Sequence, residues 1–186
     1  MILSTLMVFL YTKTTLDTSR EINERNINVN TPSVDALQEL KILVLNSKML
    51  VTNWVNVQRS SDDPEKQKLI RLMENGYPKL KSEISGISEN WNKDEVDTLK
   101  MLYARIDTLF QKYEYIKGIL STFESYLDEM TKMEADYMVT RDGEVDVQAK
   151  TVIDNLDGLI ERQRSNSKVG TDRMIDSFGK LENVVI

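Results

Sequence analysis

The chain has 186 residues and a mass of 21.5 kDa, and its 40% apolar and 29% charged residues are ordinary for one folded domain with a single core. Only 7 glycines and 3 prolines occur, so the composition favours long helices over the many tight turns of a β-sandwich. The formal net charge of -6, without a dense lysine or arginine cluster, excludes a typical nucleic-acid partner.

Cysteine and histidine are both missing from the sequence. The chain therefore has no disulfide or zinc-thiolate site, and it lacks the commonest general base and metal ligand. No phosphate-binding loop or nucleophile-base pair replaces them, and the acidic pairs Asp62/Asp63 and Asp94/Glu95 fit helix caps better than a Ca²⁺ loop. We therefore expect that the protein is not an enzyme and that it has no metal site and no cofactor. A hydrolase that uses carboxylates alone is the one enzymatic alternative that remains.

The two ends of the chain are apolar. Residues 1–12, MILSTLMVFLYT, carry no charge, but a bilayer span needs ~20 apolar residues. Neither the basic region nor the cleavage site of a signal peptide flanks them. We therefore predict that residues 1–12 are the end of a transmembrane helix and that residues 184–186 begin a second one. An ordinary buried N-terminal helix is the alternative.

The first helix of the core is predicted to cover residues 31–58. Thr31 has the position of an N-cap and Pro32 that of the first helical residue. Two adjacent apolar stripes follow, so this helix must contact more than one neighbour. The stripes consist of Ala36, Leu40, Leu43, Leu50, Trp54 and Val57, and of Leu37, Val44, Val51 and Val55.

A second helix is predicted from Pro64 to Trp91, with Asp63 as its N-cap. Its apolar spacing continues through Gly76-Tyr77-Pro78, which indicates one kinked helix rather than two. The apolar residues that follow this spacing are Ile70, Met73, Tyr77, Leu80, Ile84, Ile87 and Trp91.

The third helix is predicted to follow Asn92, which with Glu95 resembles a capping box. The fourth helix is less regular, because polar residues interrupt its apolar stripe and Asp142-Gly143 indicates a turn or distortion near its start. The third carries Val96, Leu99, Tyr103, Ile106, Phe110, Tyr113, Ile116 and Leu120, and the fourth carries Ala149, Val152, Leu156, Leu159 and Ile160 before Met174, Phe178 and Leu181.

Helix lengths predict how these elements are arranged. At 1.5 Å per residue, the first three helices each cover ~40–45 Å if they run up and down. The fourth helix then starts near residue 136, and residues 122–135 form a crossover cap that is either helix or loop. We predict an all-α, up-down-up-down four-helix bundle over residues 13–183, with its core at residues 31–163.

The long first and fourth helices extend beyond this core as a membrane-proximal stalk, over residues 13–30 and 164–183. Polar side chains are expected to face each other there, so the stalk would be thin and mobile unless a second subunit packs against it. These residues are Asn23, Asn26, Asn28 and Asn30 on one helix, and Gln163, Ser167 and Gly170 on the other.

The stretch VDALQELKILVLNSKMLVTNWVNVQRSSDDPEKQKLIRLMENGYPKLKSEISGISENWNKDE resembles the extracellular domains of two-component sensor kinases of the Bacteroidetes group. The predicted architecture resembles the four-helix-bundle sensor domains of bacterial chemoreceptors and sensor histidine kinases. The resemblance covers about residues 30–165 and rests on helical patterns without a catalytic motif. It implies a homodimer that binds a small ligand or a protein and shifts its fourth helix against its first.

These features together predict the extracytoplasmic, periplasmic ligand-sensing domain of a signal-transduction receptor in the inner membrane. Its flanking helices would cross the membrane, and its first and fourth helices would pass on a conformational signal. The alternative is a membrane-anchored helical scaffold or adaptor that binds a protein partner.

The predicted register places Trp54, Arg71, Tyr113 and Arg141 at about the same height on four helices. Arginines and aromatic hydroxyls at one level would suit a ligand with a carboxylate group. The alternative is that the two aromatic residues fill the core and the two arginines are solvated. Met130, Met133 and Met138, near the crossover cap, are either an adaptable partner surface or ordinary core residues.

Overall fold

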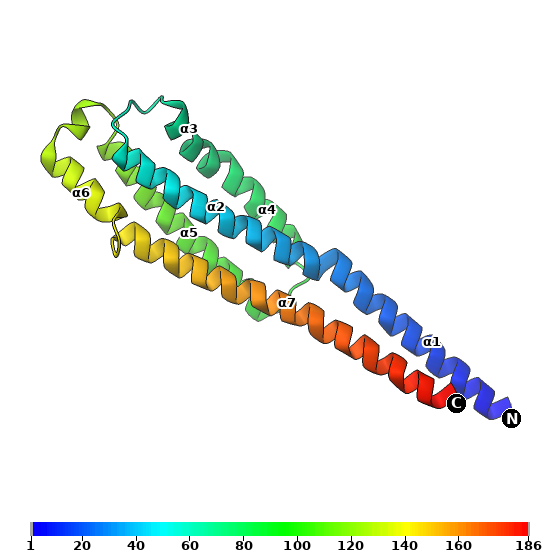
Figure 1. Ribbon diagram of the computed structural model, residues 1–186. Coiled ribbons are helices and arrows are strands. Elements are labelled where there is room, and N and C mark those ends of the chain that lie inside the picture. The colour runs from blue at the N-terminus through cyan, green and yellow to red at the C-terminus, as the bar shows by residue number, and fades with distance from the viewer. Residues whose placement is uncertain (1, 186) are drawn as a thin grey trace. The chain divides into compact units, whose positions relative to one another are not determined.

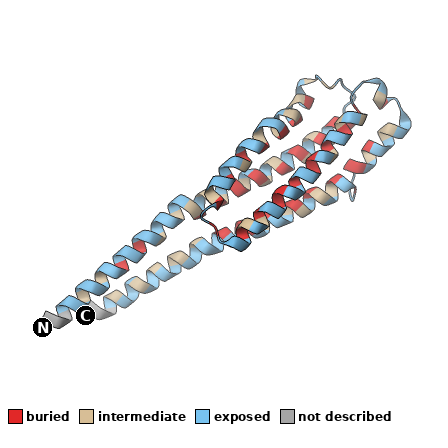
Figure 2. Ribbon diagram, turned by 180° about the vertical axis from the view of Figure 1, so that it is seen from behind, coloured by how far each residue is buried: buried red, intermediate tan, exposed pale blue. Residues whose placement is uncertain are grey.

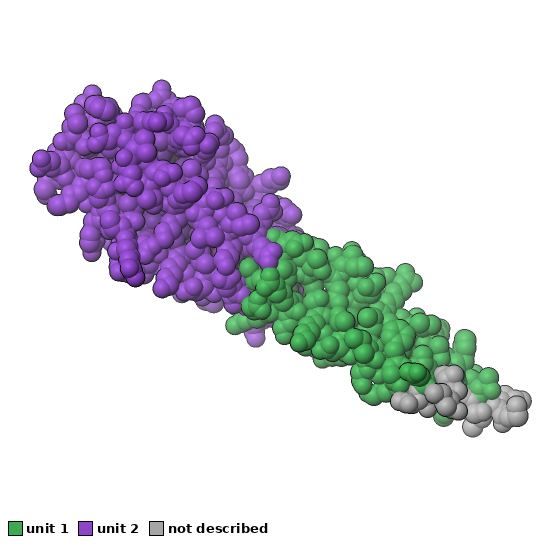
Figure 3. Space-filling model, viewed as in Figure 1, with its two compact units in different colours: residues 1–35, 160–186 green, residues 36–159 purple. Residues whose placement is uncertain are grey.

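The computed structural model describes the backbone of residues 2–185 and the side chains of residues 5–182. Residues 2–185 consist of helices joined by turns and short loops, and no strand occurs among them (Figure 1). The all-α prediction is therefore confirmed. The chain divides into two compact units, which we call unit 1 (residues 1–35 and 160–186) and unit 2 (residues 36–159) (Figure 3).

Unit 1 is built from two helical segments far apart in the sequence. The first is α1 (Ile2–Arg25), which continues through the π-helical turn η1 (Asn26–Asn30) into the start of α2 (Thr31–Asn56). The second is the C-terminal part of α7 (Glu144–Val185). The side-chain amide of Asn26 donates a hydrogen bond to Thr171 Oγ1 (3.4 Å), so the two segments are in direct contact.

The interior of unit 1 is polar. Among its described side chains, Ile160 is the one buried apolar residue. Gly170 allows a close approach, because a Cβ atom at this position would lie 3.1 Å from Cγ2 of Ile22. Ser19 Oγ and Gln163 Nε2 are buried without a hydrogen-bond partner in the described part of the chain. The buried polar residues are Thr15, Ser19, Asn30, Ser33 and Gln163.

Unit 2 has an apolar core. Buried residues gather on the inward faces of its long helices (Figure 2). Fully buried side chains include Leu37, Leu40, Trp54, Ile84, Ile106, Tyr113 and Leu156. Besides parts of α2 and α7, unit 2 contains α3 (Pro64–Arg71), η2 (Leu72–Gly76), α4 (Tyr77–Ser88), α5 (Lys93–Ile119), η3 (Glu124–Tyr126) and α6 (Glu129–Val139).

Ion pairs identify neighbouring helices within unit 2. Lys41 of α2 binds Asp157 of α7 (Nζ–Oδ1 2.6 Å), and Lys48, about two turns further along α2, binds Asp146 of α7. The residue numbers rise on α2 as they fall on α7, so the two helices run antiparallel. Lys81 of α4 pairs with an aspartate of α5, and Tyr77 of α4 packs edge-on against a phenylalanine of α5.

Both π-helical turns end two residues before a proline: η1 precedes Pro32 and η2 precedes Pro78. A proline inside a helix has no N–H group to donate and clashes with the carbonyl four residues earlier. A π-turn widens the backbone at this point, so the helix continues instead of breaking. Residues 64–88 are therefore one continuous helical segment, as predicted. The predicted N-cap at Thr31 is wrong, because this residue has helical angles (φ -65°, ψ -51°).

Two other predicted caps are confirmed. The Asp63 side chain accepts a hydrogen bond from the Glu65 N–H (2.9 Å) at the start of α3. The Asn92 side chain accepts one from the Glu95 N–H (2.9 Å) at the start of α5. Each cap satisfies one of the N–H groups that the first helical turn leaves without an internal partner.

The crossover cap contains a helix of its own. The predicted 122–135 segment includes the 3₁₀ turn η3 and most of α6. The last long helix begins at Glu144, not near residue 136. Asp142 has a positive φ of 65°, and with Gly143 it forms the turn that ends α6 and starts α7.

Within residues 2–185, no helix has a stretch that is both long and apolar enough for a membrane span. Within α1 the uncharged stretch ends at Thr12, before the charged Lys13, and is shorter than the ~20 apolar residues that a span needs. The predicted location in the inner membrane, with an extracytoplasmic domain, is therefore wrong. The side chains of residues 1–4 and 184–186, parts of the two predicted spans, lie outside the described residues.

The Asp142-Gly143 turn gives a test of the fold. A Cβ atom at Gly143 would lie 2.2 Å from the carbonyl oxygen of Tyr137, so Gly143→Ala is expected to lower the free energy of unfolding by more than ~2 kcal/mol. Asp142→Gly, at the positive φ, is expected to raise it by up to ~1 kcal/mol. Urea unfolding measures both, and equal effects of the two substitutions would contradict this turn geometry.

Candidate functional site

A small hollow lies at the end of unit 2 where α2 gives way to α3. Its volume is about 200 Å³. The last turns of α2, the connecting loop and the first turn of α3 supply its walls. It is lined by Leu50, Asn53, Trp54, Val57, Arg59, Asp63, Glu65 and Lys66.

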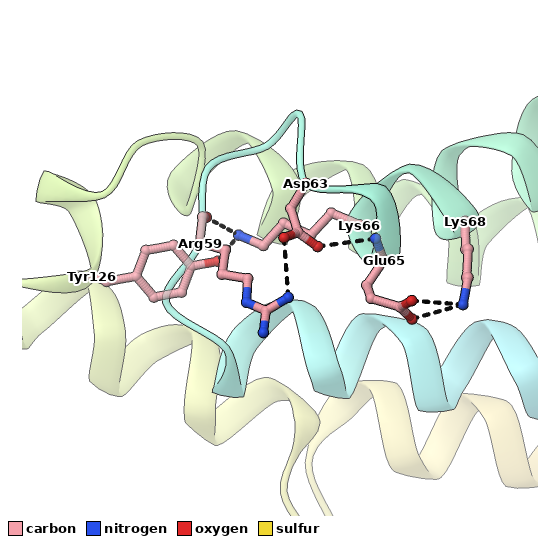
Figure 4. Close-up of polar contacts among 6 residues, drawn as sticks. All are labelled: Arg59, Asp63, Glu65, Lys66, Lys68 and Tyr126. Carbon is pink, nitrogen blue, oxygen red and sulfur yellow. Dashed lines mark hydrogen bonds and ion pairs between the residues drawn. The ribbon is translucent and has the colours of Figure 1, made fainter.

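Lys66 is the central residue of this site, because its charged group is held inside the protein (Figure 4). The residue is only 4% exposed. Its Nζ atom lies 4.8 Å from the ring centroid of Trp54 and 4.5 Å from that of Tyr126. It also donates hydrogen bonds to the Tyr126 hydroxyl (2.5 Å) and to the Arg59 carbonyl. Cation–π contacts and hydrogen bonds thus replace part of the water that the ammonium loses.

The two aromatic residues are themselves fixed by backbone carbonyls. Tyr126 donates its hydroxyl hydrogen to the Trp54 carbonyl (2.6 Å), and the Trp54 indole N–H donates to the Leu120 carbonyl (3.2 Å). We call Trp54, Lys66, Leu120 and Tyr126 the lysine cluster. It joins the end of α2, the start of α3 and the segment after α5, which are distant in the sequence.

Burial changes the proton affinity of the lysine cluster. Loss of hydration lowers the pKa of Lys66 from 10.5 to about 8, and the nearby charge of Asp63 opposes this change. Burial raises the pKa of Tyr126 to about 12. At neutral pH the lysine is therefore mostly charged and the tyrosine is neutral, and the lysine loses its proton just above the physiological range.

Exposed charges surround the mouth of the hollow. Arg59 pairs with Asp63 (3.1 Å), and Lys68 pairs with Glu65 (2.7 Å), both at the surface (Figure 4). The Lys68–Glu65 pair is solvated and contributes little to stability, whereas the Asp63 side chain is only 16% exposed. Lys66 uses two ammonium hydrogens within the protein, and its side chain also lines the hollow. Among the described residues, no group of three or more acidic side chains is placed to hold a metal ion.

The four residues predicted as a ligand site differ in their surroundings. Trp54 is 2% exposed and lines the hollow. Tyr113 is fully buried, accepts a hydrogen bond from Ser47 (3.4 Å), and has a pKa raised by burial. Arg71 and Arg141 are exposed. Within residues 5–182, no ring contact, ion pair or hydrogen bond is seen between any two of the four, and the four-residue site stays a hypothesis.

Neither Lys66 nor Tyr126 was predicted as a site residue from the sequence. A signal for Lys66 was present, because it lies three residues before Leu69 and seven before Met73, on the inward stripe of the second helix. A charged residue at an inward position is unusual and indicates a buried partner. Tyr126 lies in an irregular segment, where spacing does not predict which side chains are buried.

No protein-family model, no curated protein and no solved structure matches this chain. The likeness to bacterial sensor domains therefore stays a prediction from the helical pattern.

The buried lysine makes stability depend on pH. Below pH 8, Lys66 is charged in both the folded and the unfolded chain. Folding must then bury a charged group, which lowers the free energy of unfolding. Between pH 8 and 10.5 the unfolded chain binds more protons at this residue, so its contribution to the free energy of unfolding rises with pH. Between pH 7 and pH 9.5, the free energy of unfolding of the wild type is expected to rise relative to that of Lys66→Met. Urea unfolding at the two pH values measures this change. A difference that is the same at both pH values would show that Lys66 is not desolvated.

The Tyr126 hydroxyl gives a second test of the lysine cluster. Tyr126→Phe leaves the Lys66 ammonium and the Trp54 carbonyl each without one buried partner, so a loss of ~1–3 kcal/mol in the free energy of unfolding is expected. Tyr137→Phe removes the same atom from an exposed ring and is the matched control. Equal stability of the two variants would show that the cluster does not hold this end of unit 2 together.

Proposed function

We propose that this chain is a signal-input module, in which unit 2 receives a small ligand or a protein and unit 1 carries the resulting change onward. The observation that carries this proposal is the polar interior of unit 1, with the buried Ser19 hydroxyl and Gln163 amide nitrogen unpaired in the described part of the chain. Binding rather than catalysis is proposed, since the residues around the lysine cluster offer contacts to a ligand but no paired acid and base.

A polar interior suits a change of packing. Apolar interiors strongly favour one interlocked arrangement, because each buried CH₂ group contributes ~0.8 kcal/mol. In unit 1, small polar side chains and the glycine at position 170 form the contact instead. Alternative arrangements of α1 and α7 would then differ little in free energy, which is the requirement for a two-state element that a weak signal can bias.

The continuity of α7 supports the same proposal. This helix runs from Glu144 to Val185 without interruption and supplies residues to both units. A continuous helix passes on rotation or translation along its axis, because its backbone hydrogen bonds resist local deformation. The segment formed by α1, η1 and α2 likewise belongs to both units.

We further propose that unit 2 is an up-down-up-down four-helix bundle, with α2, the α3–α4 segment, α5 and α7 as its helices. The antiparallel α2–α7 pairing and the α4–α5 ion pair support this arrangement.

The long first and fourth helices would form the stalk of a homodimer. Exposed apolar residues of unit 1 support a second subunit, because it would cover them. They include Leu6, Phe9, Leu10, Leu16, Ile175 and Phe178.

A helical scaffold or adaptor is the second candidate function. It is favoured by one observation in unit 2, the exposed apolar residues of α6, which include Met130 and Tyr137. Such a protein would bind its partner without passing a change to unit 1.

The input step can be tested by thermal unfolding of the full chain with acetate, succinate, aspartate and glutamate, because the lysine cluster favours small carboxylates. At least one of them is expected to raise Tm saturably. Lys66→Met should abolish the rise, whereas Lys100→Met, which changes an exposed lysine of α5 outside the hollow, should preserve it. A wild-type Tm unchanged by all four would contradict carboxylate binding at this site.

The transmission step can be tested with cysteines, because the chain has none of its own. Ile22→Cys and Gly170→Cys place two thiols where α1 and α7 approach closely. The carboxylate that raises Tm is expected to change the rate of disulfide formation several-fold. A rise in Tm without any change in this rate would favour the scaffold function.

A further inference from the structure

Helix α6 presents an apolar stripe to solvent. Met130, Met133 and Tyr137 are 71%, 62% and 69% exposed, and their spacing of three and four residues places them on one helical face. The opposite face is packed into unit 2 through Ala135, Met138 and Val139. Helix α6 thus has two apolar faces. One is buried against unit 2, and the other is exposed to solvent.

The uncovered face is larger than α6 alone. Phe123 and Leu127, in the segment that leads into the helix, are also exposed. Isolated exposed apolar residues are common, but five large ones within fifteen residues are typical of an interaction surface. Methionine side chains are flexible and polarisable, so they adapt to partners of different shape.

A hollow adjoins this stripe. Tyr137 and Glu134 of α6 line it together with Lys112 and Tyr115 of α5 and Glu144 of α7. Its volume is about 380 Å³, enough for one or two large side chains. The Tyr115 hydroxyl donates a hydrogen bond to Glu134 (2.6 Å), which fixes one wall, and Lys112 is neutralised by Glu144. An apolar stripe beside a hollow is a suitable surface for a helix with one anchoring side chain.

The surroundings of the stripe are acidic. Residues 121–137 contain five carboxylates and a single lysine, and this Lys132 is already paired with Asp136 within α6. Exposed carboxylates of this kind attract cations and repel anions at the range of the Debye length, about 10 Å in ~0.1 M salt. The remaining four carboxylates are Glu124, Asp128, Glu129 and Glu134.

We propose that the exposed face of α6 docks a cationic amphipathic helix of a partner protein. Its apolar side would cover Met130, Met133 and Tyr137, and its lysines or arginines would meet the acidic surroundings. The same face of a second copy fits less well here, because two acidic surfaces would meet. The proposal goes beyond the signal-input function and does not depend on the lysine cluster.

The test uses the full chain and a fluorescent amphipathic peptide of leucine and lysine, ~18 residues long, with its leucine–glutamate counterpart as the control. Fluorescence anisotropy is expected to show saturable binding of the cationic peptide alone. The double variant Met130→Gln/Met133→Gln should weaken it about tenfold, because apolar burial is lost. The double variant Met49→Gln/Met101→Gln, at two other exposed methionines, should leave Kd unchanged.

A charge variant completes the test. Glu129→Lys should weaken binding several-fold, and Glu83→Lys, which lies on α4, should have no such effect. The proposal is overturned by absence of binding, or by binding that the Met130/Met133 variant does not alter, since this would be general attraction to acidic surfaces. Sedimentation of the protein alone gives a third way to overturn it, namely a dimer that the same methionine variant dissociates.

Discussion

Burial of the apolar faces of α2, α4, α5 and α7 is the interaction on which the rest of the chain depends. In unit 2 these faces form a core that contains residues such as Leu40, Ile84, Ile106 and Leu156. Such a core fixes the helices in place, so the chain can bury the charged Lys66 and turn sharply at Asp142. Unit 1 has no comparable core among its described residues, because its buried side chains other than Ile160 are polar.

This difference divides the roles that we propose for the two units. An ammonium enclosed by Trp54 and Tyr126 needs the fixed surroundings that unit 2 supplies, because its desolvation is offset only when its partners stay in position. The weak contacts of unit 1 suit a segment that has to change its packing. The exposed apolar face of α6 lies on a helix that unit 2 holds by the opposite face, where Ala135 and Val139 are buried.

Local patterns predicted those features that depend on the nearest neighbours in the sequence. The apolar spacing of α5 and the caps at Asp63 and Asn92 were predicted correctly, because helix periodicity and capping act over a few residues. The N-cap prediction at Thr31 was wrong, since a Thr-Pro dipeptide can either start a helix or follow a π-turn within one. The contact between Lys66 and Tyr126 joins residues 60 positions apart and depends on the tertiary fold.

Hydrogen–deuterium exchange along α7 tests the central claim most directly, because one uninterrupted helix serves both units. Differences in protection along it then report packing rather than helix type. The account predicts slow exchange for amides of residues 148–159 and exchange at least ~100-fold faster for residues 164–182, since the polar contact of unit 1 opens at lower cost. Equal protection in both stretches would contradict the claim that unit 1 is the more easily rearranged part of the chain.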